Sequence, residues 1–139
     1  MSGTESLIST DVAKTLGVVL LTVPAIAGGG IFMLRVVQGA APATSLQKTF
    51  FRAGHAHACV LVILGSLLAL TIDLAGVTGW AATLSRGVLL AAILMPAGFF
   101  LSVSYRDADK PNGLILLLWL GVVSLVVGVV AGGVGLVRA

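Results

Sequence analysis

The sequence predicts an all-α fold, an integral membrane bundle of four transmembrane helices. Of its 139 residues, 58% are hydrophobic and only 9% are charged, and the mean hydropathy is +1.15, far from the balance of a soluble domain. Each of four stretches without charged residues is long enough to cross about 30 Å of hydrocarbon as a helix; these stretches are 15–34, 53–72, 87–105 and 111–137. Their apolar runs lack the alternation of barrel strands. We therefore expect one multi-pass domain, 1–139, in the cell membrane.

The first span is expected at about 13–35. Asp11 precedes the first lysine, Lys14, so this segment lacks the basic start of a cleaved signal peptide and should be retained. The second span, about 51–73, begins within FFRAGHAHACV at 50–60. An arginine and two histidines therefore stand at the head of an otherwise apolar helix.

The third span is expected at about 85–106, and the fourth at about 113–137, after a turn made by Pro-Asn-Gly at 111–113. The fourth carries Gly128 and Gly132 four residues apart, a spacing that lets two helix backbones approach closely. Such a face can pack inside the bundle or against another copy of the chain. We expect a homo-oligomer that uses helix faces including these two glycines.

Basic residues near the span ends predict the orientation. Four spans place both termini on one side, with three basic residues, against five on the other: Lys14, Arg86 and Arg138 against Arg35, Lys48, Arg52, Arg106 and Lys110. The positive-inside rule then puts both termini outside the cytoplasm. These positions also suit contact with the lipid bilayer and its headgroups, and they offer no continuous basic surface for nucleic acid.

The two histidines are the first candidates for function, because ionisable side chains within or at the lip of a membrane helix are costly to bury. Two residues apart, they point about 200° from each other, so they cannot both bind one metal ion on a regular helix. His55 shares its face with small and polar residues, Cys59, Val62, Ser66, Ala69 and Asp73, which suits the bundle interior. His57 shares its face with Leu61, Leu64, Leu68 and Thr71, which suits lipid or a neighbouring subunit.

A histidine in this position can ligate haem iron, or it can simply lie at the interface, wetted by headgroups and hydrogen-bonded to the loop between spans three and four. The chain has two histidines, both in the second span, so two helices of one chain cannot each supply one to a haem. A haem would use one histidine with an open site, a methionine such as Met33, or a ligand from another protomer. Arg35, Arg52 and Arg106 could hold propionates or anchor the helices to lipid phosphates.

Size, four spans, Arg52 followed by His55 and His57, and AGFFLS at 97–102 leading into PNG at 111–113 resemble a known family. This family is the four-helix membrane haem isomerases, of the styrene oxide isomerase and hydroxylaminobenzene mutase type. The resemblance implies haem b bound by a span-two histidine at the interfaces of a trimer, with the iron acting as a Lewis acid on the substrate oxygen. It implies that His57 or His55 is the iron ligand and that Tyr105 faces the pocket.

Together these arguments predict a haem b site made by His57, His55, Arg52, Met33, Tyr105 and Arg106, with His57 ahead of His55 as the iron ligand. The expected function is that of an isomerase-like protein acting on a small apolar substrate that enters from lipid. A non-catalytic membrane subunit or assembly factor, packing through its glycine-rich faces, is the alternative. A proton-coupled exporter is disfavoured, because every carboxylate lies at a span end or in a loop.

Overall fold

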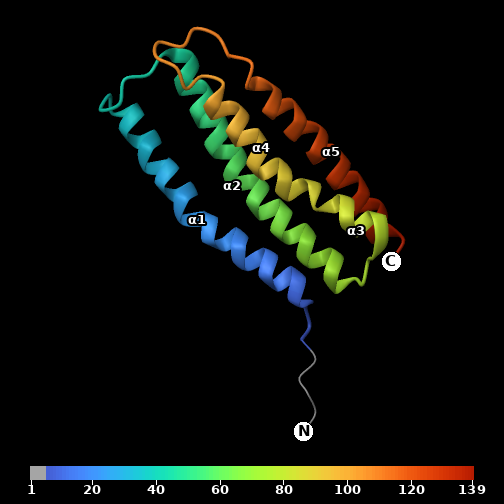
Figure 1. Ribbon diagram of the computed structural model, residues 1–139. Coiled ribbons are helices and arrows are strands. Elements are labelled where there is room, and N and C mark those ends of the chain that lie inside the picture. The colour runs from blue at the N-terminus through green and yellow to red at the C-terminus, as the bar shows by residue number, and fades with distance from the viewer. Residues whose placement is uncertain (1–5) are drawn as a thin grey trace.

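The computed structural model describes residues 6–139, which form an all-α bundle (Figure 1). The helices are α1 (Thr10–Val37), α2 (Ser45–Leu74), α3 (Gly79–Ser85), α4 (Gly87–Leu101) and α5 (Ile115–Val137). α3 and α4 follow each other as one rod, Gly79–Leu101, so the described chain has four rods long and apolar enough to cross a membrane. The predicted fold class is confirmed, and the start of α1 and the C-terminus lie at the same end of the bundle (Figure 1).

The helical rod that corresponds to the third predicted span runs from Gly79 to Leu101, five to six residues earlier than the expected 85–106. Arg86 lies inside this rod, between α3 and α4, and not at its start. Its exposed side chain forms an ion pair with Asp11. At the other end of the rod, Asn112 hydrogen-bonds to the last carbonyl groups of α4. Its side-chain amide donates to the carbonyl of Leu101 at 3.1 Å, and its backbone N–H donates to the carbonyl of Ser102 at 2.8 Å.

α2 begins earlier than the expected residue 51 because Thr44 and Gln47 form a capping box at its start. The side-chain amide of Gln47 also donates to the carbonyls of Val103 and Tyr105, each at 3.0 Å. These bonds join the start of α2 to the loop between α4 and α5. At the end of the bundle away from the termini, these hydrogen bonds hold the α4–α5 loop against α2.

Glycines set the close packing of α5 inside the bundle. A Cβ atom at Gly128 would lie 2.7 Å from the backbone nitrogen of Val88 in α4, and one at Gly132 would lie 2.9 Å from Cδ1 of Leu68 in α2. Both distances are too short for a side chain, so each glycine is covered by its own chain. The expectation that Gly128 and Gly132 form an interface between copies is therefore wrong, and packing within the bundle is their role.

The core lies between α2, α4 and α5. Its buried centre is Leu61, Ala91 and Met95, against which Ala92, Val122 and Leu125 pack. Leu61 is only 3% exposed, and Leu68 covers Gly132. These two leucines belong to the face of α2 that carries His57, so the prediction that this face meets lipid or a neighbouring subunit is wrong for them. Leu64, at 37% exposed, lies at the outer edge of the same face.

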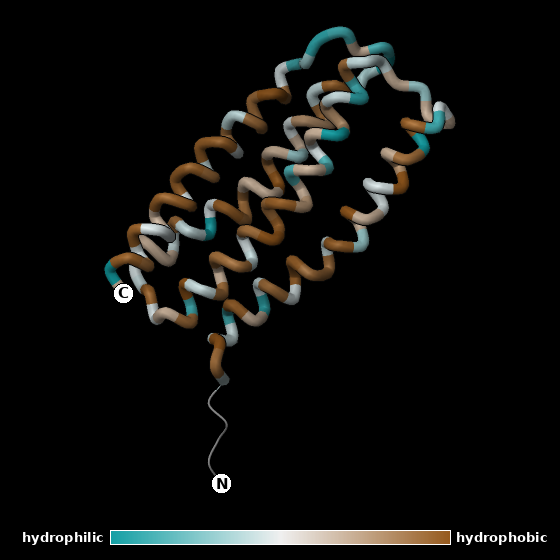
Figure 2. The backbone as a smooth tube through the Cα atoms, turned by 180° about the vertical axis from the view of Figure 1, so that it is seen from behind, coloured by the Kyte–Doolittle hydropathy of each residue, from teal (hydrophilic) through white to brown (hydrophobic). Residues whose placement is uncertain are grey.

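α1 stands apart from this core. Among the described helices its backbone approaches only α2, and its buried residues, Val12, Met33 and Val36, lie near its two ends. The wide spacing between α1 and the other helices is visible in Figure 1, and the same helix is largely hydrophobic in Figure 2. An apolar helix with so little protein cover requires lipid around it. The chain is thus a small multi-pass membrane protein in contact with the bilayer.

Candidate functional site

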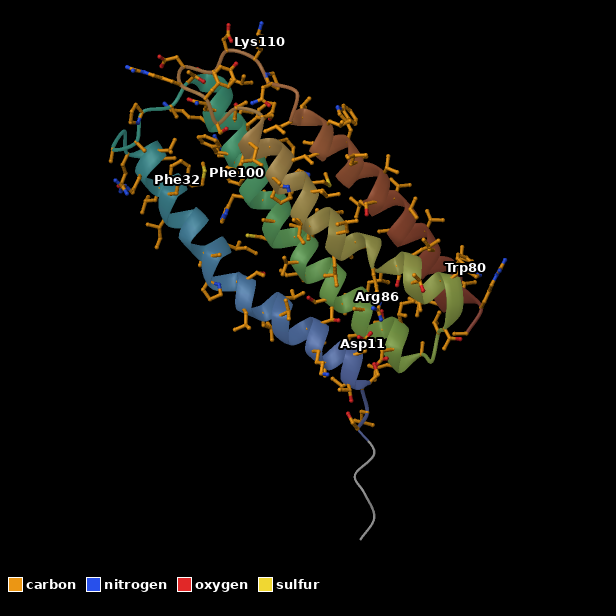
Figure 3. All side chains as sticks on the ribbon, in the orientation of Figure 1. Asp11, Phe32, Trp80, Arg86, Phe100 and Lys110 are labelled. Atoms are coloured by element: carbon orange, nitrogen blue, oxygen red, sulfur yellow. The ribbon has the colours of Figure 1, made fainter. Side chains whose placement is uncertain are left out.

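An elongated groove of about 680 Å³ lies between α1 on one side and α2 and α4 on the other. Its walls are mostly aliphatic and aromatic, with Thr22 as a polar residue between its two ends. Asp11, Lys14 and Thr15 line it at the terminal end of α1, and Gly29 and His55 line it nearer the other end. In Figure 3, Asp11 and Arg86 mark the first end, and Phe32 and Phe100 lie towards the second.

The ends of α1 are tied to the bundle by different interactions. At the terminal end, Asp11 forms its ion pair with Arg86, and the backbone N–H of Ser9 donates to the carboxylate of Asp73 at 2.7 Å. At the other end α1 meets α2 through an edge-to-face pair of aromatic rings. The tethers at both ends, with little contact between them, leave the groove open along the middle of α1.

Three aromatic rings join the helices at the loop end. Phe32 of α1 packs edge-to-face on Phe51 of α2, with 5.4 Å between centroids, and Phe51 stacks on Phe100 of α4 at 5.5 Å. Gly54 of α2 admits this arrangement, because a Cβ atom there would lie 2.9 Å from the ring of Phe100. Phe100 itself lines the groove, so this aromatic row bounds it.

His55 is the one imidazole that lines the groove. Both of its ring nitrogens are turned towards α1: a Cβ atom at Gly29 would lie 3.3 Å from Nδ1, and one at Gly30 would lie 3.5 Å from Nε2. Nε2 is also 3.9 Å from Sγ of Cys59, one turn along α2. Glycine in the AGGG stretch thus makes room for a histidine of the facing helix.

His57 points away from the groove, as the two-residue spacing predicts. Its Nδ1 lies 2.8 Å from the carbonyl oxygen of Ala53, and its ring packs on Phe99 of α4 with 5.1 Å between centroids. The side chain is half-buried. The two histidines therefore lie in different environments, one facing α1 and the other beside α4.

None of the other predicted site residues lines the groove. Arg52 is exposed, Met33 is buried near the end of α1, and Arg106 is almost fully exposed in the loop, with its Nε 3.5 Å from a carboxylate oxygen of Asp107. The Tyr105 hydroxyl does not face the groove, because it hydrogen-bonds to Asp109 and to the carbonyl of Lys110. None of these residues therefore shares the groove with His55.

The expected hydrogen bonds from a histidine to the loop between spans three and four are made by other residues. Gln47 bonds the loop as described above, and the Thr44 hydroxyl donates to the carbonyl of Ala108 at 2.8 Å. His57 instead bonds within its own helix. The polar residues at the start of α2, rather than the histidines, fix this loop.

The two histidines differ in how well they suit a haem iron. Within residues 6–139, no three side chains of histidine, cysteine, aspartate or glutamate are grouped to hold a metal ion, and the two imidazoles face α1 and α4 respectively, so they would not bind one iron together. The nitrogen edge of His55 is covered by α1 at Gly29 and Gly30, which leaves no room there for a flat macrocycle. His57 fits better, because Nδ1–H can donate to Ala53 and leave Nε2 as the ligating atom.

Sequence reasoning missed most of the groove. Lys14, Pro96 and Phe100 line it, but each looks ordinary in a membrane helix. Only Pro96 could have been recognised from the sequence. A proline has no N–H, so the carbonyl of Ala92, which also lines the groove, has no helical donor. The separation of α1 from α4 had no signal in the sequence.

No protein-family model, curated protein or solved structure matches this chain.

Proposed function

We propose that this protein binds an apolar molecule from the bilayer in the groove between α1, α2 and α4, with His55 in the groove wall towards the loop end. The observation that carries the proposal is a groove of about 680 Å³ whose lining is mostly apolar, with His55 towards one end and Asp11, Lys14 and Thr15 at the other. Ligand sites commonly have this composition, an apolar cavity of about 300–1,000 Å³ with a few polar groups that fix orientation.

A further feature supports a ligand that arrives through lipid. The groove is bounded by α1, whose central part has little protein cover, so an apolar molecule can enter sideways.

A photoreactive diazirine hydrocarbon in vesicles tests this function. The label should concentrate on residues that line the groove, and Ala58→Phe should reduce it severalfold, because Ala58 lines the groove and the added ring would fill it. Ala56→Phe is the matched control, since Ala56 lies on the same helix and is exposed. Equal labelling of both variants and the unmodified protein would contradict a binding role for the groove.

A second candidate function is haem b binding through Nε2 of His57, in the manner of the membrane haem isomerases. It is favoured by the 2.8 Å separation of His57 Nδ1 from the Ala53 carbonyl oxygen, the arrangement usual for an imidazole that ligates iron. Arg52 is exposed on the same helix and would be available to a propionate. When bound, the haem would supply a Lewis acid that polarises an oxygen of the substrate.

Absorbance spectra of protein expressed with ample haem test this second function. The Soret band should be lost in His57→Ala and should only shift in His55→Ala. Loss in His55→Ala with retention in His57→Ala would reverse the assignment. Colourless protein that takes up no added haem would end the haem proposal and leave the groove proposal intact.

A further inference from the structure

The charges at the two ends of the groove are unequal. At the terminal end its lining includes one carboxylate and one ammonium, Asp11 and Lys14. Asp11 is already paired with Arg86, and no ion pair among residues 6–139 includes Lys14. The nearby carboxylate of Asp73 accepts from the backbone of Ser9 and does not line the groove. Lys14 is therefore the cation that a ligand in the groove would meet.

The groove is long. Fifteen residues of helix separate Lys14 from Gly29, which corresponds to about 22 Å of rise, more than half of the roughly 30 Å hydrocarbon thickness. Both residues line the groove, so a hydrocarbon chain can lie along it, parallel to α1.

We propose that the ligand is an amphiphile with an anionic head, drawn from the leaflet on the side of the termini, with the head at Lys14 and a hydrocarbon chain running along α1 towards His55. This inference rests on the proposed groove function and adds the ligand's chemical class and orientation. A carboxylate or phosphate head would bind Lys14 at the membrane surface, where the lysine side chain is exposed. The aliphatic wall would cover the chain, and Phe100 would meet its far end.

A pair of photoreactive probes tests the class and the orientation together. One is a long-chain fatty acid with a diazirine near the end of its chain, and the other is the matching alcohol. In neutral lipid vesicles the acid should label residues around His55 and Phe100, and it should do so about fivefold more than the alcohol, as expected for one lysine acting on an anionic group at the membrane surface.

Charge variants give the decisive comparison. Lys14→Gln should reduce labelling by the acid to the level of the alcohol and leave the alcohol unchanged. Lys110→Gln, an exposed lysine in the loop at the other end of the bundle, is the control and should change neither. Because Lys14 is exposed, its substitution is not expected to disturb folding.

The outcomes separate this inference from the function on which it rests. If acid and alcohol label the groove equally, with or without Lys14, and Ala58→Phe abolishes both, the groove binds apolar ligands but has no anionic head site. If chain-end labels appear near Lys14 instead of His55, the proposed orientation is overturned. If neither probe labels the groove in any variant, the groove function fails as well.

Discussion

At the scale of single residues, the contact of His55 with Gly29 and Gly30 decides how closely α1 approaches the bundle. The sequence correctly predicts that the two histidines face opposite ways, because helical geometry alone fixes their directions. It cannot predict what each one meets, since that depends on how α1 and α4 pack against α2. The leucines beside His57 show this: an apolar face looks the same whether it contacts lipid or the core.

Gly29→Leu is expected to push α1 away from α2, because a Cβ atom at this position already lies 3.3 Å from Nδ1 of His55. Distances between spin labels on α1 and α2 should increase by about 1–2 Å, because the added carbon atoms need contact distances of about 4 Å from the imidazole. Gly28→Leu is the control, since nothing lies within 4 Å of a Cβ atom there. The increase should disappear in the double variant Gly29→Leu/His55→Ala, and its persistence would refute the contact.

At the scale of helices, glycine spacing marks close packing but not the partner. Gly128 and Gly132 meet Val88 and Leu68 of their own chain, although the same spacing is typical of helix interfaces between subunits. The span boundaries show a similar ambiguity. Arg86 ends an uncharged stretch without ending the helical rod, because an exposed ion pair with Asp11 accommodates its charge.

Replacing both Gly128 and Gly132 with leucine should destabilise the bundle itself. Each new side chain would enter space held by Val88 or Leu68, and overpacking of this kind costs about 1–3 kcal/mol per site. The midpoint of thermal unfolding in detergent should fall by several degrees at least. Gly133→Leu is the control, because nothing lies within 4 Å of a Cβ atom at Gly133. Dissociation of an oligomer with an unchanged midpoint would contradict the intrachain role.

At the scale of the whole molecule, composition and four uncharged stretches were enough to predict four spans and termini at one end. The groove could not be predicted from them, because it arises from the loose contact of α1 with the rest of the bundle. Hydropathy does not distinguish a helix packed on protein from one surrounded by lipid. Of the residues predicted for a haem site, only His55 lines the groove.

The orientation of the whole bundle in the membrane remains a prediction from charge: the end with the loops carries five basic residues and the end with the termini carries three. In a Cys59→Ser background, Ser6→Cys should react with an impermeant maleimide in intact cells, and Ser104→Cys should react only after the membrane is permeabilised. Both positions are exposed and uncharged, so neither change alters the charge count, whereas Ala108 in the same loop is fully buried and would not report. The opposite labelling pattern would place the termini in the cytoplasm, and the mouth of the groove at Lys14 would then open to the inner leaflet.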